Sequence, residues 1–454
     1  MTAQPTVYNN APSLYRVTDG LGVWSYRGKV AAVGIGHSPT QRRWDGDPQT
    51  TIGAYAITAV RKAIADAGVK PEDVDGLVFD PMTSPGSVWP PDQPVPADFL
   101  AAFENTSDPL DGLAQFNAEW LLKNMPELKN VKYVLHAPLC ASMVITAAFE
   151  SVGRGLTNTV IALKGWHNFA GRYYQNGPAL EPTVSGYLKH SDFTYAGAPS
   201  YSTAQQFQRY LWKYKKSHDQ MAPFIVNSRN NGLLFPEGYW AQHRPTPLME
   251  EEYKAARWIA KPANLLDNDM PIQAAAAYVI TTSERAKDLA QPPVYVLGHA
   301  GGGSVKGDAY SNIELPSAIE TLEQAQFNAA STARRVYEAA GVTAGDIHFE
   351  NFYDGFSLFH VFWIEGFGFA GVKEGECLDF FQTDITIHGP NPVSPSGGNI
   401  GSGRTRFWKW TDTIQQLQGR AGARQITGVD ARVGVVGGFM PFWSNHAVLT
   451  KDPV

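Results

Sequence analysis

Cys140 is the residue whose type and position most clearly suggest chemistry, and it is one of two cysteines in the chain. It directly precedes a run of small and apolar residues that predicts a helix over 141–155. The N-terminus of a helix favours negative charge, so a thiol placed there ionises more easily. Cys140 is therefore a candidate nucleophile, although a free cysteine is equally often a small buried apolar side chain. Cys377 lies in a predicted loop and is interpreted as incidental.

The remaining sequence signals exclude several kinds of site. The chain has no CxxC pair, so it encodes neither a disulfide framework nor a zinc site. A glycine run at 301–303 resembles a phosphate cradle, but no GxGxxG or GK(S/T) pattern completes it. With 43 acidic and 37 basic residues and no block of like charge, the composition argues against nucleic acid as a partner.

Strands and helices alternate around Cys140. A buried strand over 29–36 runs into a glycine turn, a helix with one apolar face follows over 51–67, and a strand covers 74–79. This order predicts α/β layers. Further elements are expected as a helix at 114–124 and strands at 132–136 and 159–164.

The second half of the chain repeats this order of elements. A strand over 293–299 runs into the glycines at 301–303, and a long helix over 318–340 follows. The later elements are a strand at 348–352, a helix at 357–367 and a closing strand pair at 433–438 and 447–449. A duplicated α/β core explains this repetition better than a single Rossmann unit.

Four segments follow from this interpretation. Residues 1–28 form an irregular N-terminal arm, 29–292 form the first half and 293–454 form the second half. The first half contains a large insertion at 165–290, in which helices are expected at 203–217 and 273–289. No basic start with an apolar run and no apolar stretch of about 18 residues is present, so a cytoplasmic protein is expected.

Several segments in this order resemble the thiolase superfamily, and specifically its sterol-carrier-associated branch. The resemblance spans roughly residues 29–450 and implies the thiolase fold, a duplicated five-layer αβαβα core. The segments that carry it are Ala32–Gly36, Ala63–Gly68, Val74–Leu77, Cys140–Ser142, Tyr353–Ser357, Gly366–Phe369, Ser396–Gly403 and Gly437–Leu449.

The resemblance assigns possible roles to individual residues. Cys140 stands at the nucleophile position if two residues are deleted before Gly155; without gaps, Pro138 stands there. Arg404 replaces the usual histidine, and Val435 and Val436 replace the second cysteine. An arginine stays charged and cannot shuttle protons near neutral pH, but it can stabilise an oxyanion or bind an acyl or phosphate group.

Tyr353 replaces the polar residue that opens the family's C-terminal catalytic loop. Its phenol could donate a hydrogen bond to an oxyanion or act as acid and base. His446 in the final hairpin resembles a histidine of thiolase-like steroid lyases, so Tyr353, His446 and Cys140 are the candidate catalytic residues. The candidate substrate-binding residues are Arg404, Asp354, His136, Gly397 and Gly398. Each of these side chains could instead be structural, and Asp354 in particular could brace its loop.

The implied activity is retro-aldol cleavage of a β-hydroxyacyl-CoA with a steroid or another bulky apolar chain. A retro-aldol needs a base for the β-hydroxyl and a donor for the enolate oxygen, but no nucleophilic cysteine. Two alternatives remain open: a thiolase-type acyltransferase that uses Cys140, and a non-catalytic scaffold subunit. Coenzyme A enters as the thioester substrate, with no covalently bound cofactor. The branch implies a homodimer and a small partner subunit with a zinc ribbon and an OB fold.

Overall fold

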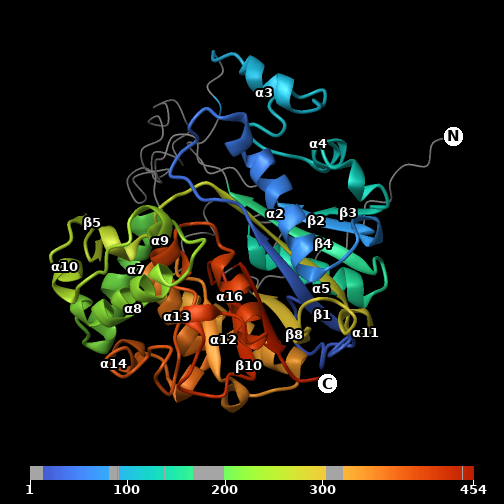
Figure 1. Cartoon of the computed structure of the whole chain (residues 1–454). Helices are drawn as coiled ribbons and strands as arrows, with labels where there is room; N and C mark the ends of the chain where they lie inside the picture. Colours follow the sequence, from blue (N-terminus) through green and yellow to red (C-terminus); the bar gives the residue numbers. More distant parts are fainter. Residues whose placement is uncertain are drawn as a thin grey trace, which may run out of the picture.

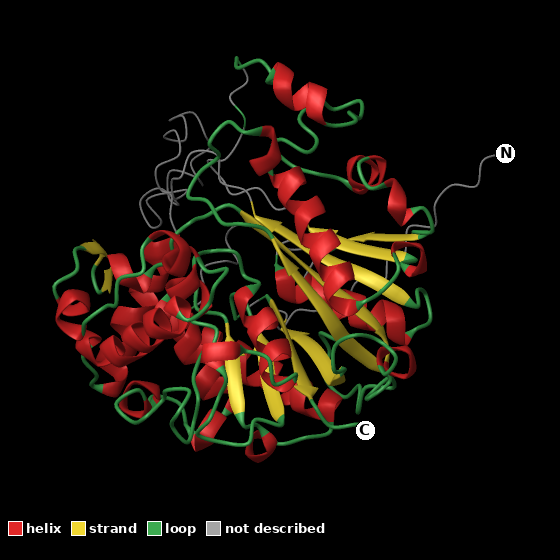
Figure 2. Ribbon diagram, viewed as in Figure 1, coloured by secondary structure: helices red, strands yellow, loops and turns green. Residues whose placement is uncertain are grey.

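A mixed β-sheet runs through the whole molecule. The computed structural model describes residues 14–80, 89, 92–137, 140–166, 199–302, 321–441 and 443–454. Within these residues nine strands form one sheet in the order β3-β2-β4-β7-β1-β8-β11-β10-β9. Figure 2 shows these strands fanned through the centre with helices on both sides.

The strand order is nearly palindromic about the junction of β1 and β8. Strands β7 and β11 each run antiparallel to both of their neighbours, at equivalent places on the two sides of that junction. The pairs β1/β8, β7/β11, β4/β10 and β2/β9 therefore correspond, as expected for a duplicated core. The bounds are β1 Val30–His37, β2 Gly76–Asp80, β3 Tyr133–His136, β4 Thr159–Trp166, β7 Ala274–Thr282, β8 Val294–Gly302, β9 Phe349–Phe352, β10 Val433–Gly437 and β11 Ser444–Thr450.

Four helices complete the layers. Helix α2 (Ile52–Ala67) covers one face of the first half-sheet, and α12 (Leu322–Ala340) packs on β8 and β11 in the second. Helices α5 (Ala141–Gly153) and α16 (Trp408–Leu417) contact strands of both halves. Side chains of β4 alternate accordingly: Ile161 and Leu163 belong to the core under α2, whereas Val160 and Ala162 belong to the core around α5.

Close strand–helix packing is duplicated as well. A β-carbon at Gly34 of β1 would overlap α2 at Ala63 and Ala67, and one at Gly298 of β8 would overlap α12 at Ala339. Glycine and alanine at these contacts let the helix backbone approach the sheet. The two halves therefore use small residues at equivalent positions.

The remaining helices surround this core. Helices α7, α8, α9 and α10 gather on one side of the molecule (green in Figure 1). Their bounds are α7 Pro199–Tyr214, α8 Ala222–Leu233, α9 Tyr239–His243 and α10 Glu250–Lys254, and a small sheet of β5 (Trp258–Ala260) and β6 (Ala263–Asn264) follows them. The others are α3 Ala97–Ala102, α4 Ala118–Lys123, α11 Ser283–Ala286, α13 Ser357–Phe367, α14 Cys377–Phe380 and α15 Gly398–Ser402.

The expected helix at 273–289 is wrong. Residues Ala274–Thr282 form β7, a buried strand between β4 and β1, and only the short α11 follows. The alanine run has high helix propensity, but pairing on both edges and burial on both faces override it. The expected insertion at 165–290 therefore runs too far, because β7 belongs to the central sheet.

Two further expectations need correction. The strand expected at 132–136 is confirmed as β3, but it is an edge strand whose side chains are alternately half-buried and exposed. Cys377 is the buried first residue of α14 rather than a loop residue. The helix expected at 203–217 corresponds to α7, and that expected at 114–124 is the shorter α4.

Residues 14–28 of the expected arm are anchored to the core. The Trp24 backbone N–H donates to the Ala339 carbonyl oxygen at 2.8 Å, and its indole Nε1 donates to Glu150 at 2.8 Å. The boundary expected at 292/293 lies between β7 and β8 and stays a prediction. No helix in the described part of the chain is long and apolar enough to cross a bilayer.

Candidate active site

Cys140 is the N-cap residue of α5, with 1% of its surface exposed. Because α5 packs against strands of both halves, its N-terminus points into the interior of the protein. Two buried ammonium groups, Lys164 and Lys409, lie close enough for their charges to act on Cys140. Cys140 is therefore buried, as a structural cysteine would be. It also lies near two cations, as a nucleophilic cysteine would. Pro138 lies outside the described residues.

Tyr353 follows β9 directly and has 2% of its surface exposed. Its ring packs edge-on against Phe439, with 5.3 Å between the ring centroids. The Lys409 Nζ lies 4.6 Å from the centroid of the Tyr353 ring, and the Arg406 guanidinium carbon lies 5.9 Å from it. The Tyr353 ring therefore packs against an aromatic side chain and has two cations beside it.

Arg404 and Arg406 meet on Trp166, the last residue of β4. Their guanidinium carbons lie 4.6 and 4.7 Å from the centroid of a Trp166 ring. The Arg404 Nε also lies 3.9 Å from Asp269 Oδ1, and both side chains are buried. Arg406 adopts a left-handed backbone with φ of 69°, a conformation that costs energy for a residue with a β-carbon.

Asp354 braces the glycine-rich loop. Its Oδ1 accepts from the Asn399 N–H at 2.7 Å and its Oδ2 accepts from the Ile400 N–H at 3.0 Å, at the start of α15. A β-carbon at Gly398 would overlap this carboxylate, and one at Gly397 would overlap the Gly232 backbone. Burial raises the pKa of Asp354. These contacts explain the glycines structurally, and their expected role in substrate binding stays a prediction.

His446 lies on β11 opposite Gly437 of β10. Its ring packs against Trp363 and Phe367, with centroid distances of 4.4 and 4.9 Å, and neither ring nitrogen hydrogen-bonds to another described residue. Burial, together with the charge of Lys409, lowers the pKa of His446 well below its usual value. The ring therefore stays neutral and is a weak base.

His136 lies at the margin of this region. Its side chain is 56% exposed, and its Nε2 lies 3.8 Å from Asp80 Oδ1. The other Asp80 oxygen accepts from the Lys164 Nζ at 2.6 Å, and both of those groups are buried. Burial lowers the pKa of Lys164 to about 8, although Asp80 opposes that shift. His136 thus reaches the site only through Asp80 and Lys164.

Two residues that sequence reasoning missed, Arg406 and Lys409, connect Tyr353, Arg404 and His446 within the described part of the chain, and a pocket shared by these three residues stays a prediction. Arg406 contacts both Trp166 and Tyr353, and Lys409 lies between Tyr353 and His446. Lysines inside apolar runs were the available signal: Lys164 ends the run at 159–163, and Lys409 stands between two tryptophans. A charge in such a run is rarely buried without a purpose.

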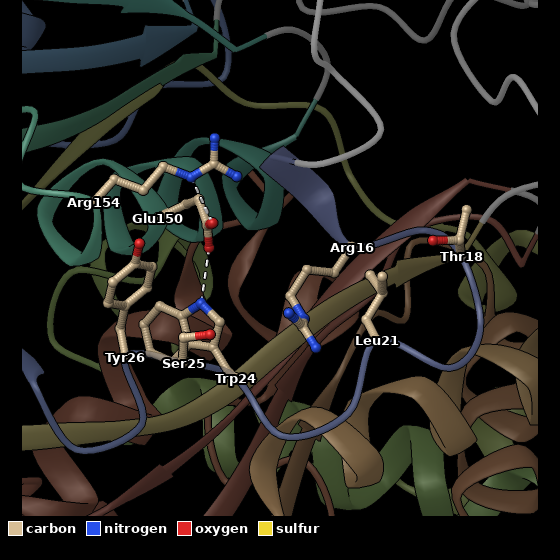
Figure 3. A pocket seen from close by; sticks show the side chains of 8 residues that line it. All are labelled: Arg16, Thr18, Leu21, Trp24, Ser25, Tyr26, Glu150 and Arg154. Carbon is tan, nitrogen blue, oxygen red and sulfur yellow. Dashed lines mark hydrogen bonds and ion pairs between the residues drawn. The ribbon is translucent and has the colours of Figure 1, made fainter.

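A pocket of about 660 Å³ lies at the opposite end of α5 from Cys140. Figure 3 shows Glu150 at its wall, held by Trp24 and Arg154. His299 Nε2 and the same carboxylate lie 2.9 Å apart. This pocket is therefore separate from the Tyr353 region, and Glu150 at its wall helps to hold Trp24 in place.

Comparisons with known proteins find relatives with thiolase-like domains. Residues 315–450 match the thiolase C-terminal domain-like family. The chain is 24% identical over 410 residues to a 17-hydroxy-3-oxo-4-pregnene-20-carboxyl-CoA lyase of Mycobacterium tuberculosis, covering 89% of this chain and 95% of the relative. It is 25% identical over 383 residues to a steroid side-chain-cleaving aldolase of Thermomonospora curvata, covering 82% and 86%.

Solved structures show the same fold. The Ltp2-ChsH2(DUF35) aldolase superposes with a TM-score of 0.69 at 20% identity, over 93% of this chain and 98% of that one. Human mitochondrial 3-ketoacyl-CoA thiolase superposes with a TM-score of 0.59 at 12% identity, over 94% and 99%. The chain thus carries a thiolase C-terminal domain-like region and is similar over most of its length to steroid-cleaving enzymes. Its fold is the thiolase fold, as the resemblance implied. The similarity to steroid side-chain-cleaving aldolases supports the expected resemblance to the sterol-associated branch.

Proposed function

We propose that this thiolase-superfamily protein is a carbon–carbon lyase that cleaves a β-hydroxyacyl-CoA by a retro-aldol reaction. The observation that carries the proposal is Tyr353, a buried phenol with the Lys409 and Arg406 cations against its ring. Val435 and Val436 are buried apolar residues where thiolases carry their second thiol, and Arg404 occupies the histidine position. A retro-aldol does not need those two groups, whereas acyl transfer by the usual relay does.

We further propose a steroid or similarly bulky apolar chain as the acyl group. Two relatives, aligned over 89% and 82% of this chain, are named for the cleavage of such substrates. The coenzyme A thioester enters as substrate. Trp166 and Phe439, which lie against Arg406, offer apolar surface beside the reacting groups.

The partner is also a proposal. The Ltp2-ChsH2(DUF35) aldolase is named for two proteins, Ltp2 and ChsH2. We propose that this chain likewise works with a small second subunit of the zinc-ribbon and OB-fold kind and forms a homodimer. A cytoplasmic location is proposed from its cysteine usage, with both described cysteines free and buried.

The test is the turnover of two variants on a β-hydroxyacyl-CoA, assayed with the partner subunit present. Tyr353→Phe keeps the ring and removes the hydroxyl, and we expect a loss of about 100- to 1000-fold in kcat, the usual cost of one oxyanion donor. Cys140→Ala is the matched control and is expected to change kcat by less than about 3-fold, because the lyase needs no thiol.

The second candidate function is acyl transfer through Cys140. It is favoured by one observation, the position of this thiol at the N-terminus of α5 beside Lys164 and Lys409. Trapping with iodoacetamide and mass spectrometry of acylated protein test it. An inactive Cys140→Ala with a nearly normal Tyr353→Phe would establish acyl transfer and exclude the lyase.

A further inference from the structure

Lys409 is buried at the centre of the candidate site. It is the second residue of α16, between Trp408 and Trp410, with 3% of its surface exposed. Its Nζ donates to the Gly438 carbonyl oxygen at 3.0 Å and lies 4.6 Å from the centroid of the Tyr353 ring. One carbonyl oxygen is little compensation for a buried ammonium group, so the charged form is costly here.

Charged and titratable groups face Lys409 from every element packed around it. They are Cys140 on α5, Glu350 on β9, Asp354 after β9, Arg406 before α16 and His446 on β11. Among the described residues, no carboxylate forms an ion pair with Lys409: Asp354 is occupied at the start of α15, and Glu350 accepts from the N–H groups of Phe352 and Ser394.

The surroundings set the protonation of Lys409. Burial lowers its pKa to about 7, although Cys140 and Asp354 oppose the shift. The amine and ammonium forms are then both accessible near neutral pH. The neighbouring arginines remain charged and cannot exchange a proton there. His446 is a weak base, so the base expected from the sequence is poorly suited to that role.

We infer that Lys409 is the acid–base catalyst of this site, an inference that rests on the proposed lyase function. The neutral amine takes the proton of the substrate's β-hydroxyl. The bond between Cα and Cβ then breaks, Cβ becomes a carbonyl, and the electron pair forms the enolate of the thioester. Tyr353 donates a hydrogen bond to the enolate oxygen, and the Lys409 ammonium returns the proton to Cα. The products are a ketone or aldehyde and a shortened acyl thioester.

The experiment follows the second half of this reaction, which needs no steroid substrate. The protein, with the proposed partner subunit present, is incubated with acetyl-CoA or propionyl-CoA in D₂O. The deuterium incorporated at Cα is then measured by NMR. We expect wild type to catalyse the exchange, with a rate that rises as the pH passes about 7 because the neutral amine must be present. In Lys409→Arg the exchange is expected to fall by at least about 100-fold, since arginine keeps the charge but cannot release a proton.

Lys409→Arg also separates catalysis from a structural role. If it exchanges Cα protons as fast as wild type, or if wild type itself exchanges none, the inference is wrong. If Lys409→Arg fails to fold, Lys409→Ala replaces it, and recovery of the exchange with added ethylamine supports the inference, whereas no recovery overturns it. Exchange that depends on Lys409 without any lyase activity would refute the proposed function and leave the acid–base role of Lys409 standing.

Discussion

Single residues decide which chemistry this site can perform. Three cations are buried against aromatic rings: Arg404 and Arg406 against Trp166, and Lys409 against Tyr353. Water screens such buried charges poorly. A developing enolate would meet these charges without any reorganisation of solvent, which is the main source of electrostatic catalysis. In the proposed lyase, a phenol, an amine and two guanidinium groups would act in place of the imidazole and second thiol of a thiolase relay.

Arg404 should stabilise the fold as well as the site. Arg404→Met leaves the buried Asp269 without this cation, and we expect a loss of about 3–5 kcal/mol in the free energy of unfolding. Arg404→Lys keeps the charge but loses the planar contact with Trp166, so a smaller loss of about 1–2 kcal/mol is expected. Urea unfolding measures both.

The matched control for Arg404 is Arg61→Met, which removes the surface pair of Arg61 with Glu127. We expect no measurable change in the free energy of unfolding for Arg61→Met, because exposed ion pairs contribute little to stability. Equal losses at both positions would contradict a special role for the buried arginine.

The sequence predicts the site residues that occupy recognisable motifs and misses those that do not. Tyr353 and Arg404 stand at motif positions, so the sequence could single them out as candidates. Lys409 and Arg406 follow the glycine loop by a few residues, and their contact with Tyr353 exists only because α16 folds back between the two half-sheets. No spacing in the sequence encodes that contact. The loop-bracing role of Asp354 could be expected, but the Asn399 and Ile400 N–H groups that donate to it carry no signal in the sequence.

At the scale of elements, glycine positions link the loops of the site. Gly398 has φ of +59°, and its missing β-carbon makes room for the Asp354 carboxylate. We expect Gly398→Ala to destabilise the protein by about 2–5 kcal/mol, since overpacking adds about 1–3 kcal/mol to about 1–2 kcal/mol of left-handed backbone strain. Chemical denaturation with a kcat measurement tests this prediction.

Gly419 supplies the control, with φ of +70° and nothing within 4 Å of its missing β-carbon. Gly419→Ala should therefore show only the backbone cost of about 1–2 kcal/mol and normal kcat. If both variants lose the same stability and keep kcat, the contact between Gly398 and Asp354 does not matter.

A second prediction at this scale concerns the contact of α7 with α13 and α14. Glu365 of α13 accepts from the Tyr210 hydroxyl and from the Cys377 N–H. Burial raises the pKa of Glu365 from 4.5 to about 7, although the Tyr210 and Cys377 hydrogen bonds oppose it. A raised pKa in the folded state means that the folded form holds its proton after the unfolded form has lost it.

Folding stability should therefore fall as the pH rises from about 4.5 to about 7 and stay level above that. The expected loss in the free energy of unfolding is about 3 kcal/mol, and Glu365→Gln, which cannot titrate, should not show it. Melting temperatures of both proteins across pH 4.5–8 measure the difference. Parallel curves would show that Glu365 ionises as freely in the folded as in the unfolded protein.

Most elements could be predicted because their patterns agree with their surroundings. The apolar face of α2 and its glycine stop at Gly68, which is left-handed, are examples. The failure at β7 has the opposite cause: its alanines prefer a helix, and only pairing with β4 and β1 makes them a strand. The secondary structure of this segment is set by its neighbours in the assembled sheet, so it cannot be predicted from the segment alone.

At the scale of the whole molecule, the sheet has one edge that invites pairing. Strand β3 lies at the end of the order, pairs only with β2 among the described strands, and exposes 44% of Val134. An unpaired edge with an apolar side chain is a surface that proteins normally cover. Strands β4, β2 and β3 run parallel up to this edge. Because β3 is the edge strand, two copies joined there would extend one sheet through the proposed dimer.

Val134→Lys should therefore convert the dimer into a monomer, because a charge on an edge strand opposes edge-to-edge pairing. Light scattering at micromolar concentration measures the mass, and circular dichroism verifies that the monomer remains folded. Leu100→Lys on α3 is the control, since Leu100 is 39% exposed but lies away from the edge of the sheet. We expect it to remain dimeric. A wild-type protein that is already monomeric and fully active alone would refute the dimer, and a Val134→Lys variant that stays dimeric would place the interface elsewhere.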